Sequence, residues 1–451
     1  MHGKVGGFSV RRWVTGTVLA ILVPALVAGC ATGERVDVAD YTAEIGDQVA
    51  TAPPMLRSGM NFGNWMRVYP LMDEYDRLDI PLLRFPAGNY GDENLLTENA
   101  LERFVRYARD MGAEPMVQHN LIQGSPEEAA RWVAWNRDND MGIRYWFIGN
   151  EPDLYAPHRG EEQWTPEYYS ETFLEYAVAI RAEDPDARII GPAVTGTPNV
   201  EWMEVFLERA GGEVDILAWQ WYPTDGTVPK DDALESAAEV GEHIELFREM
   251  AADPAINPDG YDRDIPMFIS EFGASWRTPH ARLLSDMTAA LWLAEVWGEM
   301  TLAELEYAAY FALQATGNHG LFDRSEFVRP TYFSTLFAAQ MPERWHEVSV
   351  DAERDELVVF AAIDSGSGNG SGSGNGDEPV ALEDIRRGDE VRLLLVNKLD
   401  EDVSVAFPQA GGTIVTESIN DADQEEPAEA KWRDGIRLPG YSVTQASFEW
   451  R

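Results

Sequence analysis

Cysteine is almost absent from the 451-residue chain, since Cys30 is the only one. A disulfide within the chain is therefore impossible, and metal sites built from cysteine thiolates are excluded. The seven histidines are scattered along the sequence, so no metal constellation stands out. A glycine-rich loop of the kind that joins a strand to a helix and holds phosphate is also missing. We therefore expect no metal and no cofactor.

Lysine is nearly as scarce, with only Lys4, Lys230, Lys398 and Lys431, so arginine carries almost all of the positive charge. Acidic residues dominate, because 78 Asp and Glu against 35 Lys and Arg give a formal net charge of -43. Such a surface repels nucleic acid and anionic membranes, which excludes both as direct partners. Excess carboxylate with little lysine resembles the solvation strategy of proteins from salty environments, where salt shortens self-repulsion.

The apolar run near the amino terminus, Val14 to Ala28, is too short to span a bilayer. Basic residues precede this run, a pattern typical of a signal peptide. The run continues into Val27-Ala28-Gly29-Cys30, which resembles the lipobox of bacterial lipoproteins. We interpret residues 1–30 as a lipoprotein-type signal peptide and Cys30 as the lipid acceptor. The alternative is a plain secretory signal with an incidental cysteine.

A lipid on Cys30 would place the protein at the bacterial cell envelope, at the outer membrane or the cell surface. Contact with the membrane would then run only through the lipid anchor. Residues 31–54 are acidic and lack a long apolar run, so we expect them to form a tether. Alternatively, Arg35 to Ile45 could lend a strand to a later domain.

Residues 55–341 alternate short apolar runs with longer amphipathic ones. Eight of the short runs are strand candidates: Arg57–Asn64, Pro81–Ala87, Glu114–Asn120, Tyr145–Asn150, Ala187–Val194, Asp215–Tyr222, Pro266–Glu271 and Tyr307–Gln314. The helix candidates are Leu71–Leu78, Glu98–Met111, Pro126–Asn139, Pro166–Ala182, Val200–Ala210, Asp231–Ala251, His280–Met300 and Thr331–Ala339. Eight strand-helix units in about 285 residues favour a closed (β/α)8 barrel over an open sheet, because such a barrel typically takes roughly 250 residues.

Residues 342–451 have a different sequence pattern, with short apolar or β-branched segments separated by turns. This pattern predicts an antiparallel β-sandwich with strands at Glu347–Val350, Glu356–Ile363, Glu390–Asn397, Val403–Phe407, Thr413–Ile419 and Ser442–Trp450. The Ser/Gly/Asn run 365–376 has no apolar residue and is expected to be a flexible loop inside this domain. The predicted fold class is α/β, a TIM barrel followed by a C-terminal antiparallel β-sandwich.

Two barrel strands end on a glutamate. Glu151 follows Tyr145-Trp-Phe-Ile-Gly-Asn150, and Glu271 follows Ile265-Pro-Met-Phe-Ile-Ser270. The carboxyl ends of barrel strands converge on one face, where the chemistry of such folds takes place. Paired carboxylates are what glycosidic bond cleavage requires, since one protonates the leaving oxygen and the other stabilises or attacks the anomeric carbon. Taken alone, Glu151 could equally be an exposed turn residue after a core strand.

The two carboxyl groups need different pKa values at one pH, and hence different surroundings. Glu151 lies in a stretch flanked by aromatic residues, which suits an acid whose pKa is raised toward about 6 to 7. Glu271 would be the ionised partner. Arg84, at the end of the second strand candidate, is a cation that could hold Glu271 charged.

Three stretches resemble motifs of the clan A retaining glycoside hydrolases. Gly142-Ile-Arg-Tyr-Trp-Phe-Ile-Gly-Asn-Glu-Pro-Asp-Leu-Tyr155 resembles their fourth-strand motif, and its lead-in is closest to the α-L-arabinofuranosidase and β-xylosidase branches. Ile269-Ser-Glu-Phe-Gly273 resembles their seventh-strand nucleophile motif, and Leu83-Arg-Phe-Pro-Ala-Gly88 their second-strand arginine motif. Asn-Glu-Pro alone is a weak signal, but the ordered set is specific. The resemblance covers residues 55–341 and, more loosely, the sandwich.

The resemblance implies a role for each matching residue. Glu151 is the expected general acid/base and Glu271 the nucleophile. Asn150 would donate to the sugar 2-hydroxyl, while Arg84 orients the nucleophile. Tyr222 matches the phenol that hydrogen-bonds the nucleophile in this family. A retaining mechanism further implies that the two carboxyl groups lie about 5 to 5.5 Å apart.

Further candidates for substrate contacts lie at or after strand ends. Gln220 stands where these enzymes usually have a histidine, and its amide forms hydrogen bonds but does not titrate. This departure bears on which sugar is bound. Trp276, just after the nucleophile motif, is the best candidate for a platform on which a sugar stacks. Asn120, at the end of the third strand candidate, and His319, after the eighth, are further candidates for substrate contacts. For His319 an ordinary structural role is an equal alternative.

These observations predict an exported, lipid-anchored retaining glycoside hydrolase, an enzyme that cleaves glycosidic bonds by double displacement. The expected substrates are plant or algal polysaccharides or the oligosaccharides derived from them, so the partner is carbohydrate and not nucleic acid. One alternative is a transglycosylase with the same carboxylates. Another is a surface glycan-binding lipoprotein that keeps the fold but has no turnover.

Overall fold

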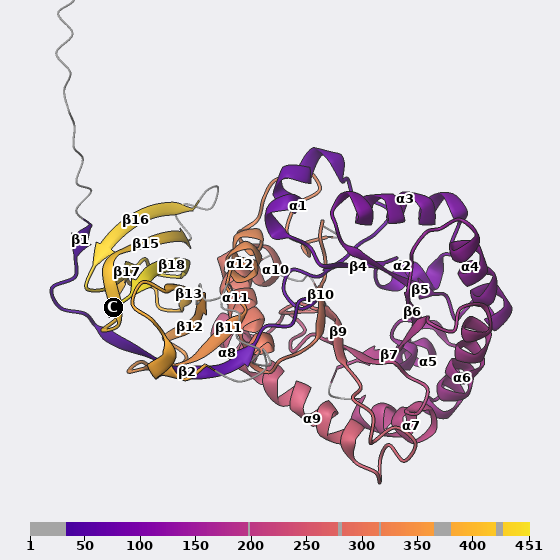
Figure 1. The fold of residues 1–451 in the computed structure, drawn as a ribbon. Coiled ribbons are helices and arrows are strands. Elements are labelled where there is room, and N and C mark those ends of the chain that lie inside the picture. Colours follow the sequence, from indigo (N-terminus) through magenta and orange to yellow (C-terminus); the bar gives the residue numbers. More distant parts are fainter. Residues whose placement is uncertain (1–32, 197–198, 278–281, 315–316, 365–379, 421–426) are drawn as a thin grey trace, which may run out of the picture. The chain divides into compact units, whose positions relative to one another are not determined.

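The computed structural model describes residues 33–196, 199–277, 282–314, 317–364, 380–420 and 427–451 (Figure 1). The expected signal peptide over 1–30, its lipid acceptor Cys30 and the Ser/Gly loop over 365–376 lie outside the described residues. Among the helices that are described, none is both long and apolar enough to cross a membrane.

Eight parallel strands close into a barrel in the order β10-β3-β4-β5-β6-β7-β8-β9. They are β3 (Met60–Asn61), β4 (Leu82–Phe85), β5 (Glu114–His119), β6 (Tyr145–Ile148), β7 (Arg188–Thr195), β8 (Ile216–Trp221), β9 (Met267–Phe272) and β10 (Tyr307–Tyr310). Each overlaps one of the eight strand candidates, and the predicted (β/α)8 barrel is confirmed. Apolar side chains such as Met116, Phe147 and Phe268 fill its interior, as expected for a packed barrel core.

Helices surround the barrel (Figure 1). They are α1 (Met72–Leu78), α2 (Asn89–Glu93), α3 (Glu98–Asp110), α4 (Pro126–Asp138), α5 (Tyr155–Arg159), α6 (Pro166–Glu183), α7 (Val200–Ala210), α8 (Lys230–Glu235), α9 (Val240–Ala252), α10 (Arg282–Ser285), α11 (Met287–Leu302) and α12 (Pro330–Ala339). The hydroxyls of Ser125 and Thr165 accept backbone N–H groups at the starts of α4 and α6, just before a proline. These caps explain why the predicted starts agree with the structure.

Two predicted long helices are each interrupted. The helix expected over Asp231–Ala251 is divided into α8 and α9 by a 3-10 turn over Ser236–Glu239. The helix expected over His280–Met300 is divided into α10 and α11 at Asp286, whose carboxylate caps α11 by accepting the Thr288 N–H at 3.0 Å. Hydrophobic periodicity continues across such breaks, so it does not reveal them.

A ten-stranded, mostly antiparallel sheet has the order β1-β16-β15-β18-β13-β12-β11-β2-β14-β17. Its strands are β1 (Glu34–Arg35), β2 (Tyr41–Thr51), β11 (Arg344–Val350), β12 (Leu357–Asp364), β13 (Glu390–Asn397), β14 (Val403–Ala406), β15 (Ala410–Asn420), β16 (Ala428–Arg433), β17 (Ile436–Leu438) and β18 (Ser442–Trp450). The predicted C-terminal β-sandwich is confirmed. Within residues 342–451, the strands β16 and β17 were not predicted, because β16 is mostly exposed and β17 has only three residues.

The acidic tether expected over residues 31–54 differs from the structure. Residues Tyr41–Thr51 form β2, which pairs antiparallel with β11 and parallel with β14. Alternate side chains of β2 point inward, and Ala43 and Ile45 are buried in the sandwich core. The alternative, in which this segment lends a strand to a later domain, is what the structure has. Burial of alternate apolar side chains holds this segment in the sheet, although the segment also carries acidic residues.

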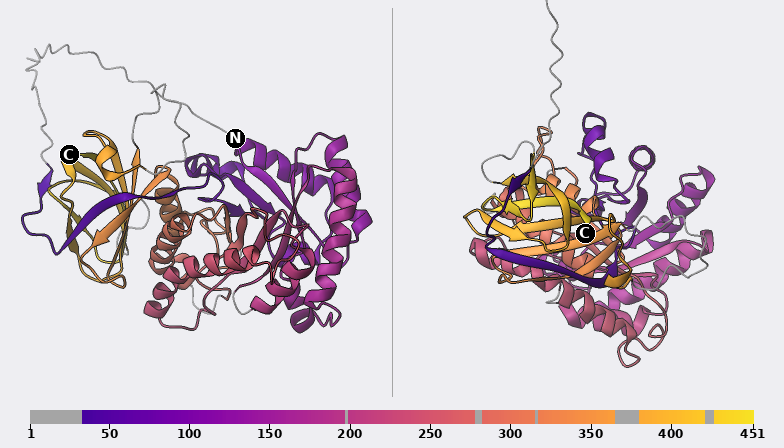
Figure 2. Two further views of the ribbon diagram at one scale, coloured as in Figure 1. Left: turned by 60° about the horizontal axis from the view of Figure 1, so that its bottom comes forward. Right: turned by 60° about the vertical axis from the view of Figure 1, so that its left-hand side comes forward.

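Helix α11 packs between the barrel and the sandwich (Figures 1 and 2). Thirteen of its sixteen residues are buried, and a helix that is apolar all round must be covered on both sides. A Cβ at Gly298 would come within 2.3 Å of the Phe360 ring on β12, so glycine allows the close approach of helix and sheet. The barrel and sandwich therefore share one apolar core along this helix.

A buried charge cluster also joins α11 to the sandwich. The Glu295 carboxylate is fully buried and lies 2.6 Å from the Lys398 ammonium and 3.2 Å from the Arg354 guanidinium. Burial raises the pKa of Glu295, whereas Lys398 and Arg354 lower it. One of the four lysines of the chain therefore serves to balance a buried carboxylate.

Replacing Lys398 by methionine is expected to lower the free energy of unfolding by about 3–5 kcal/mol, because Glu295 loses its nearest counter-charge while still buried. Chemical and thermal denaturation measure the effect. Lys431→Met is the matched control, since the Lys431 side chain is 45% exposed and its ammonium lies 3.9 Å from the Glu429 carboxylate. Exposed pairs of this kind contribute about 0–1 kcal/mol. Equal effects of the two substitutions would contradict a structural role for the cluster.

Candidate active site

The carboxyl ends of the barrel strands bring together the polar residues that the sequence predicted there. Arg84 lies on β4, Gln220 on β8 and Glu271 on β9, and all three side chains are buried. Strand register places Gln220 beside Glu271 and Asn61 beside Arg84. The flanking aromatic residues of β8, Trp219 and Trp221, pack outward on α9 and α11. Alternation along the strand therefore turns Gln220 inward.

Arg84 is the hub of these contacts. One guanidinium nitrogen, Nη1, donates to Glu271 Oε1 at 2.6 Å and to Asn61 Oδ1 at 2.9 Å. The other, Nη2, donates to Asn150 Oδ1 at 2.7 Å and to Gln118 Oε1 at 3.2 Å. The side chain is fully buried, so a charge that is costly to bury is balanced by a carboxylate and three amide oxygens. These contacts fix the guanidinium plane and, with it, the position of Glu271.

Glu271 is held at both carboxylate oxygens. Its Oε2 accepts a hydrogen bond from the Tyr222 hydroxyl at 3.1 Å, while Oε1 faces Arg84. The backbone of Gly88 adds a further hydrogen bond. Gly88 has a φ of 56° and a ψ of -147°, a backbone conformation that glycine adopts without strain. The carboxylate is thus oriented by a cation, a phenol and a backbone amide.

Glu151 begins the turn that follows β6. Its backbone is left-handed, with φ 44° and ψ 53°, which costs a non-glycine residue about 1–3 kcal/mol. The Glu151 N–H donates to the Ala193 carbonyl on β7 at 3.0 Å, so the neighbouring strand holds this turn. Asp153 anchors the turn further, because its carboxylate accepts the Thr195 backbone N–H at 3.1 Å and the Asn199 amide at 2.8 Å.

The two glutamates differ in their electrostatic surroundings. Burial raises the pKa of Glu151 well above its usual value, and the negative charges of Glu271, Asp153 and Asp92 add to the rise. Burial also raises the pKa of Glu271, but Arg84, Tyr222 and the Gly88 backbone oppose that rise. Glu151 is therefore the group that retains its proton to higher pH, and Glu271 is the more readily ionised of the pair. This is the asymmetry expected of an acid and a nucleophile.

Asn150 links Arg84 to Gln220 within the site. Its Oδ1 accepts from Arg84 and, at 2.9 Å, from Gln220 Nε2. Gln220 Oε1 is buried and has no hydrogen-bond partner among the described residues. An unpaired buried acceptor costs about 1–3 kcal/mol, so this oxygen is suited to a donor that arrives with a ligand.

The remaining predicted contact residues lie at different places. Trp276 is 54% exposed and stacks against the Arg277 guanidinium at 4.4 Å. His319 is buried beside the Tyr222 ring and is hydrogen-bonded to the Trp276 backbone, and burial lowers its pKa to about 4. Asn120 instead donates to the Asp92 carbonyl at 2.8 Å and accepts the Gln123 N–H, so its amide holds the loops together. A substrate contact by any of these residues remains a prediction.

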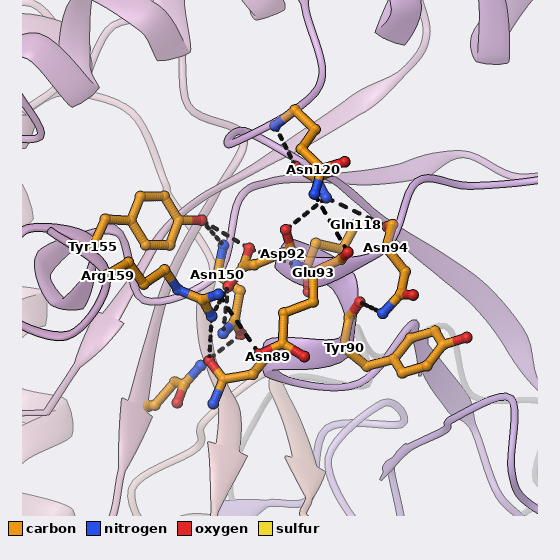
Figure 3. A network of polar contacts seen from close by, with 12 residues as sticks. Asn89, Tyr90, Asp92, Glu93, Asn94, Gln118, Asn120, Asn150, Tyr155 and Arg159 are labelled. Atoms are coloured by element: carbon orange, nitrogen blue, oxygen red, sulfur yellow. Dashed lines mark hydrogen bonds and ion pairs between the residues drawn. The ribbon is translucent and has the colours of Figure 1, made fainter. Parts of the chain in front are cut away.

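Several residues of the site were missed from the sequence. Asn61 and Gln118 each follow the inward alternation of a predicted strand, so a polar residue in a buried strand was the available signal. Asp92, Tyr155 and Arg159 come from short helices after strands, where no periodicity marks them. Figure 3 shows these three side chains gathered beside Asn150. Among the described residues no group of three or more His, Cys, Asp or Glu side chains could hold a metal ion.

A (β/α)8 barrel with Asn-Glu after the fourth strand, glutamate on the seventh and arginine on the second has the architecture of the clan A glycoside hydrolases. The predicted resemblance to this clan, close to the α-L-arabinofuranosidases, is confirmed by comparison with known proteins. No protein-family model matches the chain.

Curated relatives match part of the chain. Over 256 residues it is 22% identical to an intracellular exo-α-L-arabinofuranosidase of Bacteroides ovatus, covering 44% of this chain and 47% of that protein. Over 171 residues it is 25% identical to a probable α-L-arabinofuranosidase C of Aspergillus flavus, covering 29% of this chain and 33% of that protein. The chain thus spans less than half the length of these two relatives.

Solved structures match over most of the chain. An α-L-arabinofuranosidase of Thermotoga maritima has a TM-score of 0.69 at 14% identity, covering 91% of this chain and 100% of its own. A xyloglucanase of Paenibacillus polymyxa has a TM-score of 0.63 at 10% identity, covering 92% and 100%. At these identities the likeness establishes the fold, including the sandwich.

Proposed function

We propose that the protein is a retaining glycoside hydrolase with Glu271 as nucleophile and Glu151 as general acid/base. The observation that carries the proposal is the environment of Glu271, whose carboxylate is fixed by Arg84 and Tyr222 while its charge raises the pKa of Glu151. Two carboxyl groups with pKa values separated in this way meet the requirement for acid and nucleophile in one site.

In the proposed first step a Glu271 oxygen attacks the anomeric carbon as the glycosidic bond breaks. The Glu151 proton passes to the leaving oxygen, so an alcohol departs and a glycosyl ester forms on Glu271. In the second step Glu151, now a carboxylate, takes a proton from water. The water oxygen displaces Glu271, which regenerates both groups and retains the anomeric configuration.

The substrate class proposed first is an α-L-arabinofuranoside on plant or algal polysaccharide, or on an oligosaccharide derived from it. This choice is supported by the names of the relatives, which are arabinofuranosidases. The xyloglucanase among the structural neighbours has the same fold and acts on another glycan. A panel of aryl glycosides and polysaccharides, assayed in low and high salt, tests the proposal. We expect hydrolysis of the arabinofuranoside with retention, and no hydrolysis anywhere on the panel would contradict the enzyme.

We also propose that the protein is exported and lipid-anchored at the cell envelope through Cys30. The support is the basic and apolar run before Val27-Ala28-Gly29-Cys30 and the absence of any other cysteine. In a bacterial host, Cys30→Ser is expected to abolish incorporation of labelled palmitate and to release the protein from the membrane fraction. Labelling that persists in the variant would contradict Cys30 as the acceptor, since no other thiol exists.

A further inference from the structure

Asp92 is a buried carboxylate for which the proposed mechanism has no use. It lies in α2, immediately after the arginine-bearing strand β4, and its side chain is completely buried. Four donors from three other elements surround it (Figure 3). Oδ1 accepts from the Tyr155 hydroxyl at 2.8 Å and from Gln118 Nε2 at 3.2 Å, and Oδ2 lies 3.4 Å from Arg159 Nη2 and 3.5 Å from Asn150 Nδ2. A carboxylate enclosed by donors in this way orders whatever donates to it.

Two of those donors are the amides that hold Arg84. Gln118 directs its Nε2 at Asp92 and its Oε1 at Arg84 Nη2, and Asn150 does the same with Nδ2 and Oδ1. An amide has one acceptor end and one donor end. Because the donor ends face Asp92, which is acceptor-only when ionised, the oxygens are the ends left for the guanidinium. With no acceptor at the Asp92 position, either amide could turn and bring an NH₂ group against Arg84.

We propose that Asp92 is a positioning residue that fixes the amide orientation of Gln118 and Asn150 and so holds Arg84 on Glu271. The inference rests on the proposed glycosidase function of the site. The path runs from α2 through the ends of β5 and β6 to β4 and β9, and it reaches the nucleophile at the 2.6 Å contact between Arg84 and Glu271.

The charges around Asp92 give this role a readout in pH dependence. Arg159 from α5 and Arg84 from β4 are the cations that face it, and Glu151 after β6 is the carboxyl group whose pKa its charge raises. Burial raises the pKa of Asp92 itself to about 7, so the carboxylate is ionised in mildly alkaline solution. Removing this charge therefore lowers the pKa of Glu151.

Asp92→Asn is the test, since the amide has nearly the same shape but directs an NH₂ group at two of the four donors. We expect kcat for an aryl glycoside to fall about 10- to 100-fold, as reacting groups misplaced by an ångström or less cost about that much. We also expect the alkaline limb of the pH profile to move to lower pH. A merely structural residue would change thermal stability and leave that limb in place.

The matched control is Glu93→Gln, the next residue, whose exposed carboxylate lies 3.7 Å from Arg159 Nη1. It is expected to leave kcat and both pH limbs unchanged. Should Asp92→Asn fail to fold, Tyr155→Phe removes the hydroxyl that donates to Asp92 at 2.8 Å and accepts the Asn150 backbone N–H at 3.3 Å. A several-fold fall in kcat is expected. Wild-type kcat and an unmoved alkaline limb in Asp92→Asn, or wild-type kcat in Tyr155→Phe, would overturn the proposal.

A failure of the proposed function is distinguishable from a failure of this inference. If the wild type hydrolyses no glycoside, crystal structures of the wild type and Asp92→Asn still decide the positioning role. We expect the variant to show a longer distance from Arg84 to Glu271 than the wild type has. An unchanged Arg84–Glu271 contact of 2.6 Å in the variant would overturn the inference, whatever the enzyme's activity.

Discussion

Replacing Glu271 by alanine is expected to lower kcat for an aryl glycoside by about 10⁵- to 10⁶-fold, which is the scale of loss when a covalent nucleophile is removed from a hydrolase. The substitution removes the oxygen that attacks the anomeric carbon and leaves Arg84 without its carboxylate partner. Release of the aryl group, followed by absorbance, measures the effect.

The control for this substitution is Glu249→Ala, an exposed glutamate on α9 that lies outside the site. It is expected to retain wild-type kcat and KM. Circular dichroism and thermal unfolding of Glu271→Ala separate loss of chemistry from loss of fold. A folded Glu271→Ala protein with wild-type turnover would exclude the nucleophile assignment.

Replacing Glu151 by alanine is expected to lower kcat by about 10²- to 10⁴-fold on a substrate with a poor leaving group, the contribution typical of general acid–base catalysis. On an activated aryl glycoside the first step needs no acid, so the glycosyl ester forms. Its hydrolysis is then slow, because no general base activates water. Azide needs no base to attack, and we expect it to restore turnover and yield a glycosyl azide of retained configuration.

The pH profile gives the same substitution a second readout. Because the pKa of Glu151 is raised, the wild type retains its acid to higher pH and loses activity only as pH passes that pKa. The alkaline limb should therefore disappear in Glu151→Ala. Azide offered to Glu271→Ala is the control, since any rescue there would give the opposite anomer. An absence of rescue in a folded Glu151→Ala protein would weigh against the acid/base role.

The barrel could be predicted because its strands are buried on both faces and its helices are amphipathic. Short runs such as Tyr145–Ile148 are apolar throughout, and capped starts at Ser125 and Thr165 fix where helices begin. The strand β2 was harder to predict, because only some of its side chains are buried and acidic residues stand among the exposed ones. Its partner β11 lies about 300 residues further along, and local patterns carry no information on such pairing.

The site was predictable where a functional residue ends a strand. This holds for Glu151, Glu271 and Arg84, which each follow apolar residues at the end of a predicted strand. Their position indicated a functional site, and the family motifs indicated their roles. The residues that support them were not predictable in the same way. Asp92 lies in a five-residue helix without apolar periodicity, and its importance arises only because folding brings β5 and β6 beside it.

The proposed mechanism requires that Glu271 become covalently bonded to the sugar during turnover. A 2-deoxy-2-fluoro glycoside with an activated leaving group slows release of the glycosyl ester, so the ester can accumulate on the protein. Peptide mapping by mass spectrometry then locates the added sugar. We expect it on the peptide that contains Glu271, at that residue. A sugar attached to any other side chain would contradict the proposed nucleophile and the mechanism built on it.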